Sequence, residues 1–438
     1  MRGGLRTCLL VGLLAAPALM VACGARTGLG TGGLLDAAVI DAAEEETAEP
    51  DASRDADGSP ADAPEDAPID VTEDDALPDA GPPVPMISTN LWGCVVQASG
   101  TLKCWGAPSA DGGSLLTATA IQGLPGPVVG VTVGDFVVYA RMQDDSLQDW
   151  GDNYEFAPLG LGYNSGIVSA PTPVPSLGHE LVSAAGSAYH ACALLTTGGV
   201  ACWGSASSGA LGNGQTQGLV MSPGPVVGLA TKAVGVGTGF SFTCAVLASG
   251  AVQCWGAGWA GQLGNGSDAD HVLPVTVAGI NNATSVVCGE DHACALLANG
   301  AVKCWGEQTY GQLGDGVIAT GLEDLYSTVP VDVVGLQSGV AAIAAGHEQS
   351  TCALLSSGAV KCWGRNEWGQ LGDGTTGSRP TPTDVTGLQS NVISVSIGLR
   401  QGCALMSNGG AKCWGSGVLG DPNAPKPSLT PVDVVGLP

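Results

Sequence analysis

Cysteine is the residue type in this sequence most able to do chemistry, and its spacing is regular. The pattern Cys-x9-Cys-Trp-Gly occurs six times along the chain. The six pairs are Cys94 and Cys104, Cys192 and Cys202, Cys244 and Cys254, Cys294 and Cys304, Cys352 and Cys362, and Cys403 and Cys413. Paired thiols of this kind can form disulfides, bind zinc or stay buried as free thiols.

The segment between two paired cysteines predicts a β-hairpin. Between Cys294 and Cys304, two apolar runs flank Asn299-Gly300, which is a strong hairpin signal. A three-residue loop centred on Asn299 would place the two cysteines directly opposite each other. Their Cα atoms would then be about 4.5 Å apart, which a disulfide accommodates. A two-residue turn would offset the pair by one residue.

A seventh, degenerate copy of the pattern tests the disulfide hypothesis. Tyr139 and Asp149 replace both of its cysteines, and no copy keeps only one. Joint loss is what a bonded pair predicts, whereas two thiolates without a CxxC spacing supply only half of a zinc site. We therefore expect six disulfides, with zinc and buried free thiols as the alternatives. The unpaired Cys288 is expected to be a small buried apolar residue.

The whole region from residue 86 to residue 438 is a repeat. The Trp-Gly motif recurs every 45 to 58 residues, and a period near 50 indicates a propeller, a solenoid or an array. Three copies of the motif are followed by Gly-Gln-Leu-Gly, at 261–264, 311–314 and 369–372. A degenerate copy, Gly-Ala-Leu-Gly, lies at 209–212. A Pro-x-x-Val-x-Gly-Leu segment comes next, as in 330–336 and 382–388.

These motifs together resemble the regulator of chromosome condensation repeat. The resemblance covers about 86–438 and implies an all-β fold, a seven-bladed β-propeller. A closed ring suits such repeats because a single hairpin pair cannot bury its own faces and the ring leaves only short, protected edges. The family's eponymous member is a nucleotide exchange factor for a nuclear GTPase, but no residue matched here supports guanine nucleotide exchange. A bacterial β-lactamase inhibitor with this type of propeller implies that the loops of one face can bind a protein.

The N-terminus predicts export and a lipid anchor. Arg2 and Arg6 precede an apolar run that ends in Met20-Val21-Ala22-Cys23-Gly24, which resembles the lipobox of bacterial lipoproteins. The resemblance implies a signal peptide over 1–22 and a lipid on Cys23; ordinary signal cleavage nearby is the alternative. Residues 24–85 hold 17 acidic residues and almost no aromatics, so we expect a disordered acidic Ala/Asp/Pro linker over 23–85.

Composition and charge exclude several functions. The 14 basic and 40 acidic residues give a net charge of −26, which argues against nucleic acid as a partner. His190 and His292 share a repeat position that other copies fill with Trp, Phe, Ser and Gln, so their role is interpreted as structural. We expect no catalytic residues, no metal and no cofactor.

Two groups of residues are candidates for binding a partner. Trp259, Tyr310 and Trp368 lie between Trp-Gly and the following Gly-Gln-Leu-Gly, where exposed aromatic side chains favour interfaces. The alternative is that they pack between blades. Residues 317–329 form a longer segment than in the next copy and contain Glu323, Asp324 and Tyr326. It is either a binding insertion or a solvated loop.

The sequence therefore predicts a non-enzymatic binding or scaffold propeller. It would be exported, lipid-anchored in a bacterial cell envelope at the outer membrane or cell surface, and would recognise a protein or glycan partner through its loops. The rival hypotheses are an enzyme or enzyme inhibitor that acts at the central funnel or rim, and a structural envelope component.

Overall fold

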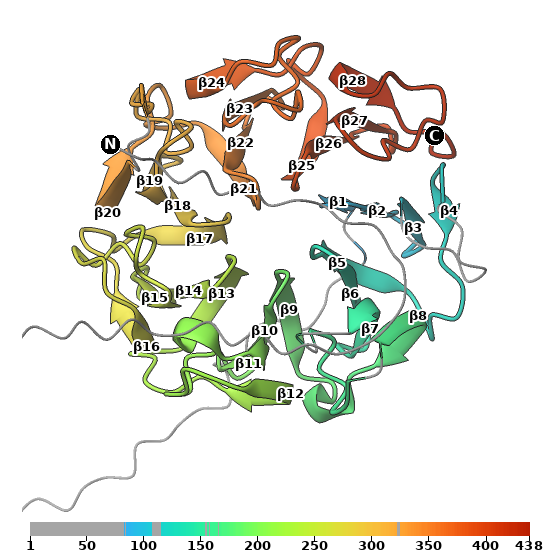
Figure 1. Ribbon diagram of the computed structural model, residues 1–438. Coiled ribbons are helices and arrows are strands. Elements are labelled where there is room, and N and C mark those ends of the chain that lie inside the picture. The colour runs from blue at the N-terminus through green and yellow to red at the C-terminus, as the bar shows by residue number, and fades with distance from the viewer. Residues whose placement is uncertain are drawn as a thin grey trace, which may run out of the picture. The chain divides into compact units, whose positions relative to one another are not determined.

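Seven four-stranded antiparallel sheets surround a central axis in the computed structural model (Figure 1). The structure describes residues 83, 85–106, 115–153, 156, 158–164, 166–321 and 325–438. The sheets are called blades 1 to 7 in chain order, and they confirm the all-β, seven-bladed propeller. The predicted signal peptide 1–22, lipidated Cys23 and linker 23–85 lie outside the described residues, apart from Pro83 and Pro85.

Each blade uses four consecutive strands, from the innermost to the outermost. Blades 1 to 3 comprise β1 (Met86–Thr89), β2 (Gly93–Val96), β3 (Leu102–Trp105), β4 (Thr119–Ala120); β5 (Val128–Val133), β6 (Val137–Met142), β7 (Leu147–Asn153), β8 (Gly166–Pro173); and β9 (Leu181–Gly186), β10 (His190–Leu195), β11 (Val200–Ser205), β12 (Leu219–Pro225). Two short 3-10 helices, η2 (Pro175–Leu177) and η3 (Ser207–Gly209), lie in connections.

Blades 4 to 7 repeat the arrangement. They comprise β13 (Ala233–Thr238), β14 (Phe242–Leu247), β15 (Val252–Gly256), β16 (His271–Thr276); β17 (Ala283–Cys288), β18 (His292–Leu297), β19 (Val302–Glu307), β20 (Tyr326–Asp332); β21 (Val340–Gly346), β22 (Ser350–Leu355), β23 (Val360–Gly364), β24 (Arg379–Asp384); and β25 (Val392–Ile397), β26 (Gln401–Met406), β27 (Ala411–Gly415), β28 (Ser428–Asp433).

The hydrophobic core lies between the blades. Each of the seven interfaces has its own apolar cluster, and each cluster includes one repeat tryptophan. The indole N–H of Trp305, for example, donates to the main-chain oxygen of Gln262 in the preceding blade at 2.9 Å. Gly264 of that motif needs to be glycine, because a Cβ there would lie 2.7 Å from the Trp305 ring. The two sequence motifs thus meet across the blade interface.

All six expected disulfides join the second and third strands of their blades. In blade 5, Cys294 pairs directly with Cys304, and Leu297 N–H donates to Ala301 O at 2.9 Å to close a three-residue loop centred on Asn299. Gly300 ends this loop at φ +77°, a conformation that glycine adopts without steric cost. The Cα atoms of the six pairs are 4.0–4.1 Å apart. Disulfides at this density indicate an exported protein.

Blade 2 fills the cysteine positions differently. Tyr139 and Asp149 stand directly opposite each other, and the Tyr139 hydroxyl donates to the main-chain oxygen of Pro158 at 2.8 Å. Both carboxylate oxygens of Asp149 are buried without a hydrogen-bond partner. Burial therefore raises the pKa of Asp149 well above its usual value.

The ring closes between two complete blades, without exchange of a strand. Blade 1 begins with β1 and blade 7 ends with β28. Thr89 joins them twice: its N–H donates to Ser396 Oγ at 3.0 Å, and its Oγ1 accepts from Gln401 Nε2 at 2.7 Å. A cluster that includes Ile87 and Leu405 packs beneath these bonds. In the part of the chain that the structure describes, no helix has the length and apolarity to cross a membrane.

Candidate functional site

The propeller has two faces that differ in composition. Because neighbouring strands are antiparallel, the turns after the first and third strands of every blade lie on one face, which we call the loop face. The disulfide hairpins and the connections between blades lie on the other, which we call the hairpin face. The loop-face segments vary more in sequence from blade to blade than the hairpin-face turns do.

Aromatic side chains mark the loop face. The blade cores take Tyr139, Phe242 and the seven repeat tryptophans. Every other aromatic residue that the structure describes lies on the loop face: Trp92, Phe136, Phe156, Tyr163, Tyr189, Phe240, Trp259, Tyr310, Tyr326 and Trp368. Four of them are 44–57% exposed, whereas the large exposed residues of the hairpin face are aliphatic, such as Val227, Val334 and Val435. Aromatic residues carry much of the energy at protein interfaces.

An apolar pocket of about 340 Å³ lies on the loop face, where blades 2 to 4 and Leu399 of blade 7 form its wall. Phe156 and Phe240 pack edge-on against the two sides of Tyr189, with ring centroids 4.5 and 4.4 Å apart. Phe136, Pro158 and Leu399 complete the wall. Its volume is at the lower end of the range for ligand sites, about 300–1,000 Å³. We call it the aromatic pocket.

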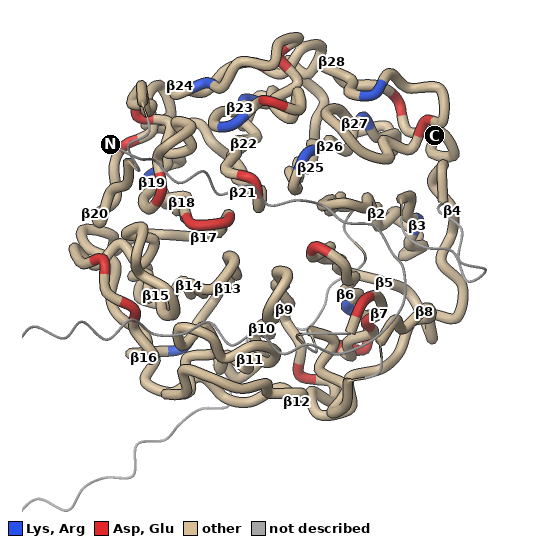
Figure 2. Tube along the Cα trace, in the orientation of Figure 1, with Lys and Arg blue, Asp and Glu red and all other residues tan. Residues whose placement is uncertain are grey.

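In blades 5 and 6, the turns after the first strands carry acidic residues: Glu290 and Asp291 after β17, and Glu348 after β21. Figure 2 shows these as red segments at the inner ends of β17 and β21. Burial, together with the nearby Asp291, Glu307 and Glu348, raises the pKa of Glu290 to about 7. Burial and Glu307 raise the pKa of Asp291 to about 7 as well. These carboxyl groups repel one another, so the surface favours a cation.

A hydrogen-bonded cluster from three blades crosses the mouth of the central channel. His347 Nδ1 lies 2.8 Å from Asp135 Oδ1, and Asn90 Nδ2 donates to the same oxygen at 2.6 Å. Burial alone would raise the pKa of Asp135, but His347 and Asn90 hold it below its usual value. Burial likewise opposes the charge on His347, and Asp135 outweighs it, so the pKa of His347 is raised.

This Asp–His pair is the arrangement that would favour an enzyme, but its groups are already occupied. Besides Asp135, the main chain of Thr238 bonds the His347 ring. Both Asp135 and His347 are less than 10% exposed. The pair therefore links blades 2 and 6.

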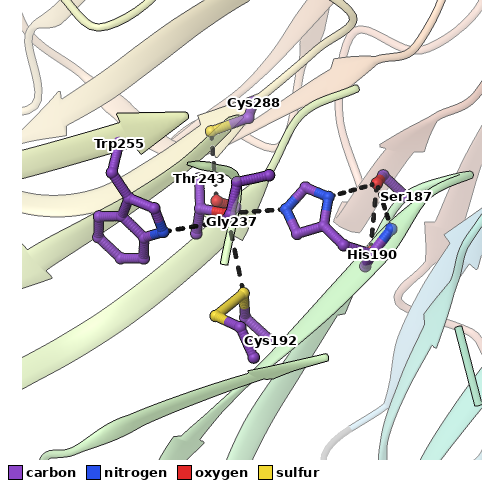
Figure 3. Close-up of a disulfide and its surroundings, with 9 residues drawn as sticks. Ser187, His190, Cys192, Gly237, Thr243, Trp255 and Cys288 are labelled. Atoms are coloured by element: carbon purple, nitrogen blue, oxygen red, sulfur yellow. Dashed lines mark hydrogen bonds between the residues drawn. A yellow bond between two sulfur atoms is a disulfide. The ribbon is translucent and has the colours of Figure 1, made fainter. Parts of the chain in front are cut away.

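His190 and His292 are structural in their contacts. His190 Nε2 lies 2.8 Å from Thr243 Oγ1 of the next blade, and the Thr243 hydroxyl donates to Ala210 O, the oxygen that also accepts from Trp255 (Figure 3). His292 makes the same contact with Thr351 at 2.9 Å. Burial and the positive His347 lower the pKa of both histidines to about 3. Cys288 is buried nearby, with its Sγ 3.5 Å from Gly237 O. Among the described residues no group of His, Cys, Asp and Glu could hold a metal.

The residues proposed from sequence for binding have different surroundings. Trp259 is 57% exposed and Tyr326 is 44% exposed. Tyr310 and Trp368 are half-buried beneath Arg365 and Arg400 of the next blade, with guanidinium carbons 4.8 and 4.5 Å from the ring centroids. Of the three aromatic residues before Gly-Gln-Leu-Gly, Trp259 is therefore exposed, whereas Tyr310 and Trp368 pack between blades. Glu323 and Asp324 lie outside the described residues.

Sequence reasoning missed the aromatic pocket and the cluster at the channel mouth. Most of their residues come from the turns after the first strands, such as 134–136, 187–189 and 239–241, and Phe156 and Pro158 come from the segment between β7 and β8. A signal was present, since these turns carry the aromatic residues Phe136, Tyr189 and Phe240 in blades 2 to 4 and acidic residues in blade 5.

The fold is a seven-bladed propeller, and its loop face differs from its hairpin face in carrying aromatic side chains. Residues 249–296, 299–353 and 357–405 match the regulator of chromosome condensation (RCC1) repeat, and residues 283–312 and 340–370 match a second description of it. The ultraviolet-B receptor UVR8 of Arabidopsis thaliana is 30% identical over 348 residues, which are 76% of this chain and 77% of that protein. The chain belongs to the regulator of chromosome condensation repeat family.

Other relatives share only the propeller. The E3 ubiquitin-protein ligase HERC2 of Mus musculus is 32% identical over 275 residues, but these are 5% of its length. Among solved structures, yeast RCC1 (Prp20), bound to Kap60, superposes with a TM-score of 0.67 at 21% identity over 80% of this chain and 84% of that chain. Human WBSCR16 gives 0.62 at 21% identity over 75% and 89%. These structures show the fold alone, and the fold supports a binding or scaffold propeller.

Proposed function

We propose that this protein is an exported, lipid-tethered and non-catalytic module that binds a protein partner with its loop face. The observation that carries the proposal is that every described aromatic side chain other than Tyr139, Phe242 and the seven repeat tryptophans lies on that face. On the hairpin face, by contrast, the large exposed side chains are aliphatic, such as Val227, Val334 and Val435. Interfaces draw on aromatic anchors surrounded by polar groups, and the loop face has both.

A protein partner suits the aromatic pocket better than a glycan. Sugar hydroxyls need hydrogen-bonding groups beside an aromatic ring. In this pocket the polar wall residues Asp135 and Ser187 already bond to His347 and His190, and the wall carboxylate Asp152 favours a positively charged partner group. The ring surfaces that remain suit an apolar side chain.

The experiment is crosslinking and affinity capture from envelope extracts with variants of each face. A loop-face variant combines Phe136→Ser, Trp259→Ser and Tyr326→Ser, three exposed positions whose change should leave the fold intact. The matched control combines Val227→Ser, Val334→Ser and Val435→Ser on the hairpin face. We expect a protein that the wild type and the control capture and the loop-face variant does not. Capture that survives the loop-face variant, or is lost in the control, contradicts the proposal.

The lipid tether rests on the lipobox-like residues before Cys23 and is tested separately. Metabolic labelling with a radioactive fatty acid should mark the wild type and leave Cys23→Ser unlabelled, and the variant should leave the membrane fraction. An unlabelled wild type would show that the protein carries no lipid tether, and the proposal would then be a secreted binding module.

A further inference from the structure

The aromatic pocket and the acidic residues of blades 5 and 6 form one continuous surface. Phe240, which forms part of the pocket wall, donates its main-chain N–H to the Glu290 carbonyl at 3.1 Å. The Glu290 side chain thus begins directly beside the pocket. Glu290 is half-buried, while the neighbouring Asp291 is 8% exposed and accepts from Gln262 Nε2 at 3.1 Å. Glu290 therefore lies at the edge of the pocket beside Phe240, whereas Asp135 and Asp152 line the pocket itself.

The positive groups of this region serve other residues. Arg400 Nε binds Glu348 at 3.0 Å and stacks on Trp368. Arg365 binds Glu367 at 2.6 Å and stacks on Tyr310. His347 is bonded to Asp135. Glu290 lies among Asp291, Glu307 and Glu348, and no ion pair of the described residues includes it.

Charge decides which occupant fits this surface. Residues 24–82 of the same chain carry 17 acidic and two basic residues, so they are repelled by Glu290 and its neighbours. The loop face of a second copy would present the same acidic group and is repelled for the same reason. The complementary occupant is a separate chain with a positive charge beside an apolar group.

We propose that the aromatic pocket binds an apolar side chain of a partner protein segment whose neighbouring Lys or Arg pairs with Glu290. This inference rests on the proposed function and names the chemistry of the partner. The apolar side chain contacts the rings of Phe136, Tyr189 and Phe240, and the cation relieves the repulsion between Glu290 and Asp291.

The binding should depend on pH in a defined direction. The charged groups that face Glu290 are Asp291 of its own loop, Glu307 of β19, and Glu348 and His347 of the loop after β21. Because the pKa of Glu290 is about 7, a fraction of the free protein holds a proton there at neutral pH. A cation requires the ionised form, so affinity rises with pH through this range and binding releases protons.

The test selects peptides from a phage-displayed random 12-residue library with the oxidised full-length protein. We expect enriched peptides to place an aromatic or aliphatic residue next to Lys or Arg. Their affinity, measured by fluorescence anisotropy at constant ionic strength, should fall about tenfold with Glu290→Gln, the scale of one charged hydrogen bond. Phe136→Ser should weaken binding as well, and the hairpin-face control Val334→Ser should not.

A readout of stability separates binding from folding. Glu290→Gln removes a repelled charge, so its melting temperature should equal or exceed that of the wild type while its affinity falls. The variant should also bind with less dependence on pH between 6 and 8. Enriched peptides without the apolar–basic pair, no enrichment, or equal affinity for wild type and Glu290→Gln would each overturn the inference.

Failure here is distinguishable from failure of the proposed function. If the captured partner is lost with the loop-face variant but retained with Glu290→Gln, the loop face binds a protein and the cation pairing is wrong. If loss of the exposed aromatics changes no capture, the proposed function itself is wrong.

Discussion

Replacing Asp149 with asparagine should remove a pH-dependent loss of stability from the propeller. Asp149 is fully buried at the position of a missing cysteine, and neither carboxylate oxygen has a partner. Burial raises its pKa well above the usual value, so the folded protein holds the group protonated over a range in which the unfolded chain ionises it. Unfolding therefore releases one proton in that range.

The magnitude follows from linkage. Below the unfolded pKa of 3.8, both states are protonated and the group has its full favourable effect. As the pH rises above that value, the wild-type free energy of unfolding should lose about 1.4 kcal/mol per pH unit from this group. The loss stops where the folded carboxyl also ionises. Asp149→Asn has no titrating group here, so the difference between the two proteins should grow in favour of the variant at that slope.

Denaturant unfolding of both proteins between pH 3.5 and 7, with disulfides intact, measures this difference. Glu290 and Asp291 also have raised pKa values, but both proteins contain them and their contribution cancels. At pH 3.5, the difference in the free energy of unfolding between the two proteins reports only the exchange of a carboxyl group without a hydrogen bond for an amide without one. A difference that stays the same at every pH would refute the assignment of a buried neutral carboxyl.

Three further outcomes are expected. Tyr139→Cys combined with Asp149→Cys should form a seventh disulfide and raise the free energy of unfolding by at most about 2.7 kcal/mol, measured by denaturation and thiol titration; an extra pair of free thiols would argue against it. His347→Gln should cost about 3–5 kcal/mol because Asp135 is left buried without its ionic partner, and adding Asp135→Asn should restore part of the loss; no recovery would count against the ion pair. Cys288 should resist thiol reagents in the native protein and react once the protein unfolds, because burial raises its pKa and blocks access; rapid native labelling would contradict this.

The repeat explains why so much of the fold could be predicted from one sequence. The Cys-x9-Cys spacing is compatible with a three-residue hairpin loop that places the cysteines opposite each other, as the structure has it. The Trp305–Gln262 bond explains why Trp-Gly and Gly-Gln-Leu-Gly recur together. Each such relation is local to one blade or to two neighbouring blades. Seven copies then repeat the same information, including the copy in which Tyr139 and Asp149 replace both cysteines.

The channel mouth could not be predicted in this way. Asp135 and His347 are 212 residues apart and stand in different repeats, so only the closure of the ring brings them together. The aromatic pocket likewise joins Phe156, Tyr189 and Phe240 from three blades through loops whose lengths differ. For Tyr310 and Trp368, the sequence identified the right loops but could not show that arginines of the next blade cover them.

The order of the cysteines has a consequence for how the protein matures during export. Every disulfide joins two cysteines ten residues apart within one blade, so the native pairs emerge one after another from a translocation channel. With Cys23 lipidated as proposed, an oxidase that joins each cysteine to the next would make the first three pairs without any later rearrangement. Cys288 interrupts this order, because it emerges six residues ahead of Cys294 and after Cys254 is already bonded. In blade 5, Cys294 could therefore bond to Cys288 before its native partner Cys304 has emerged.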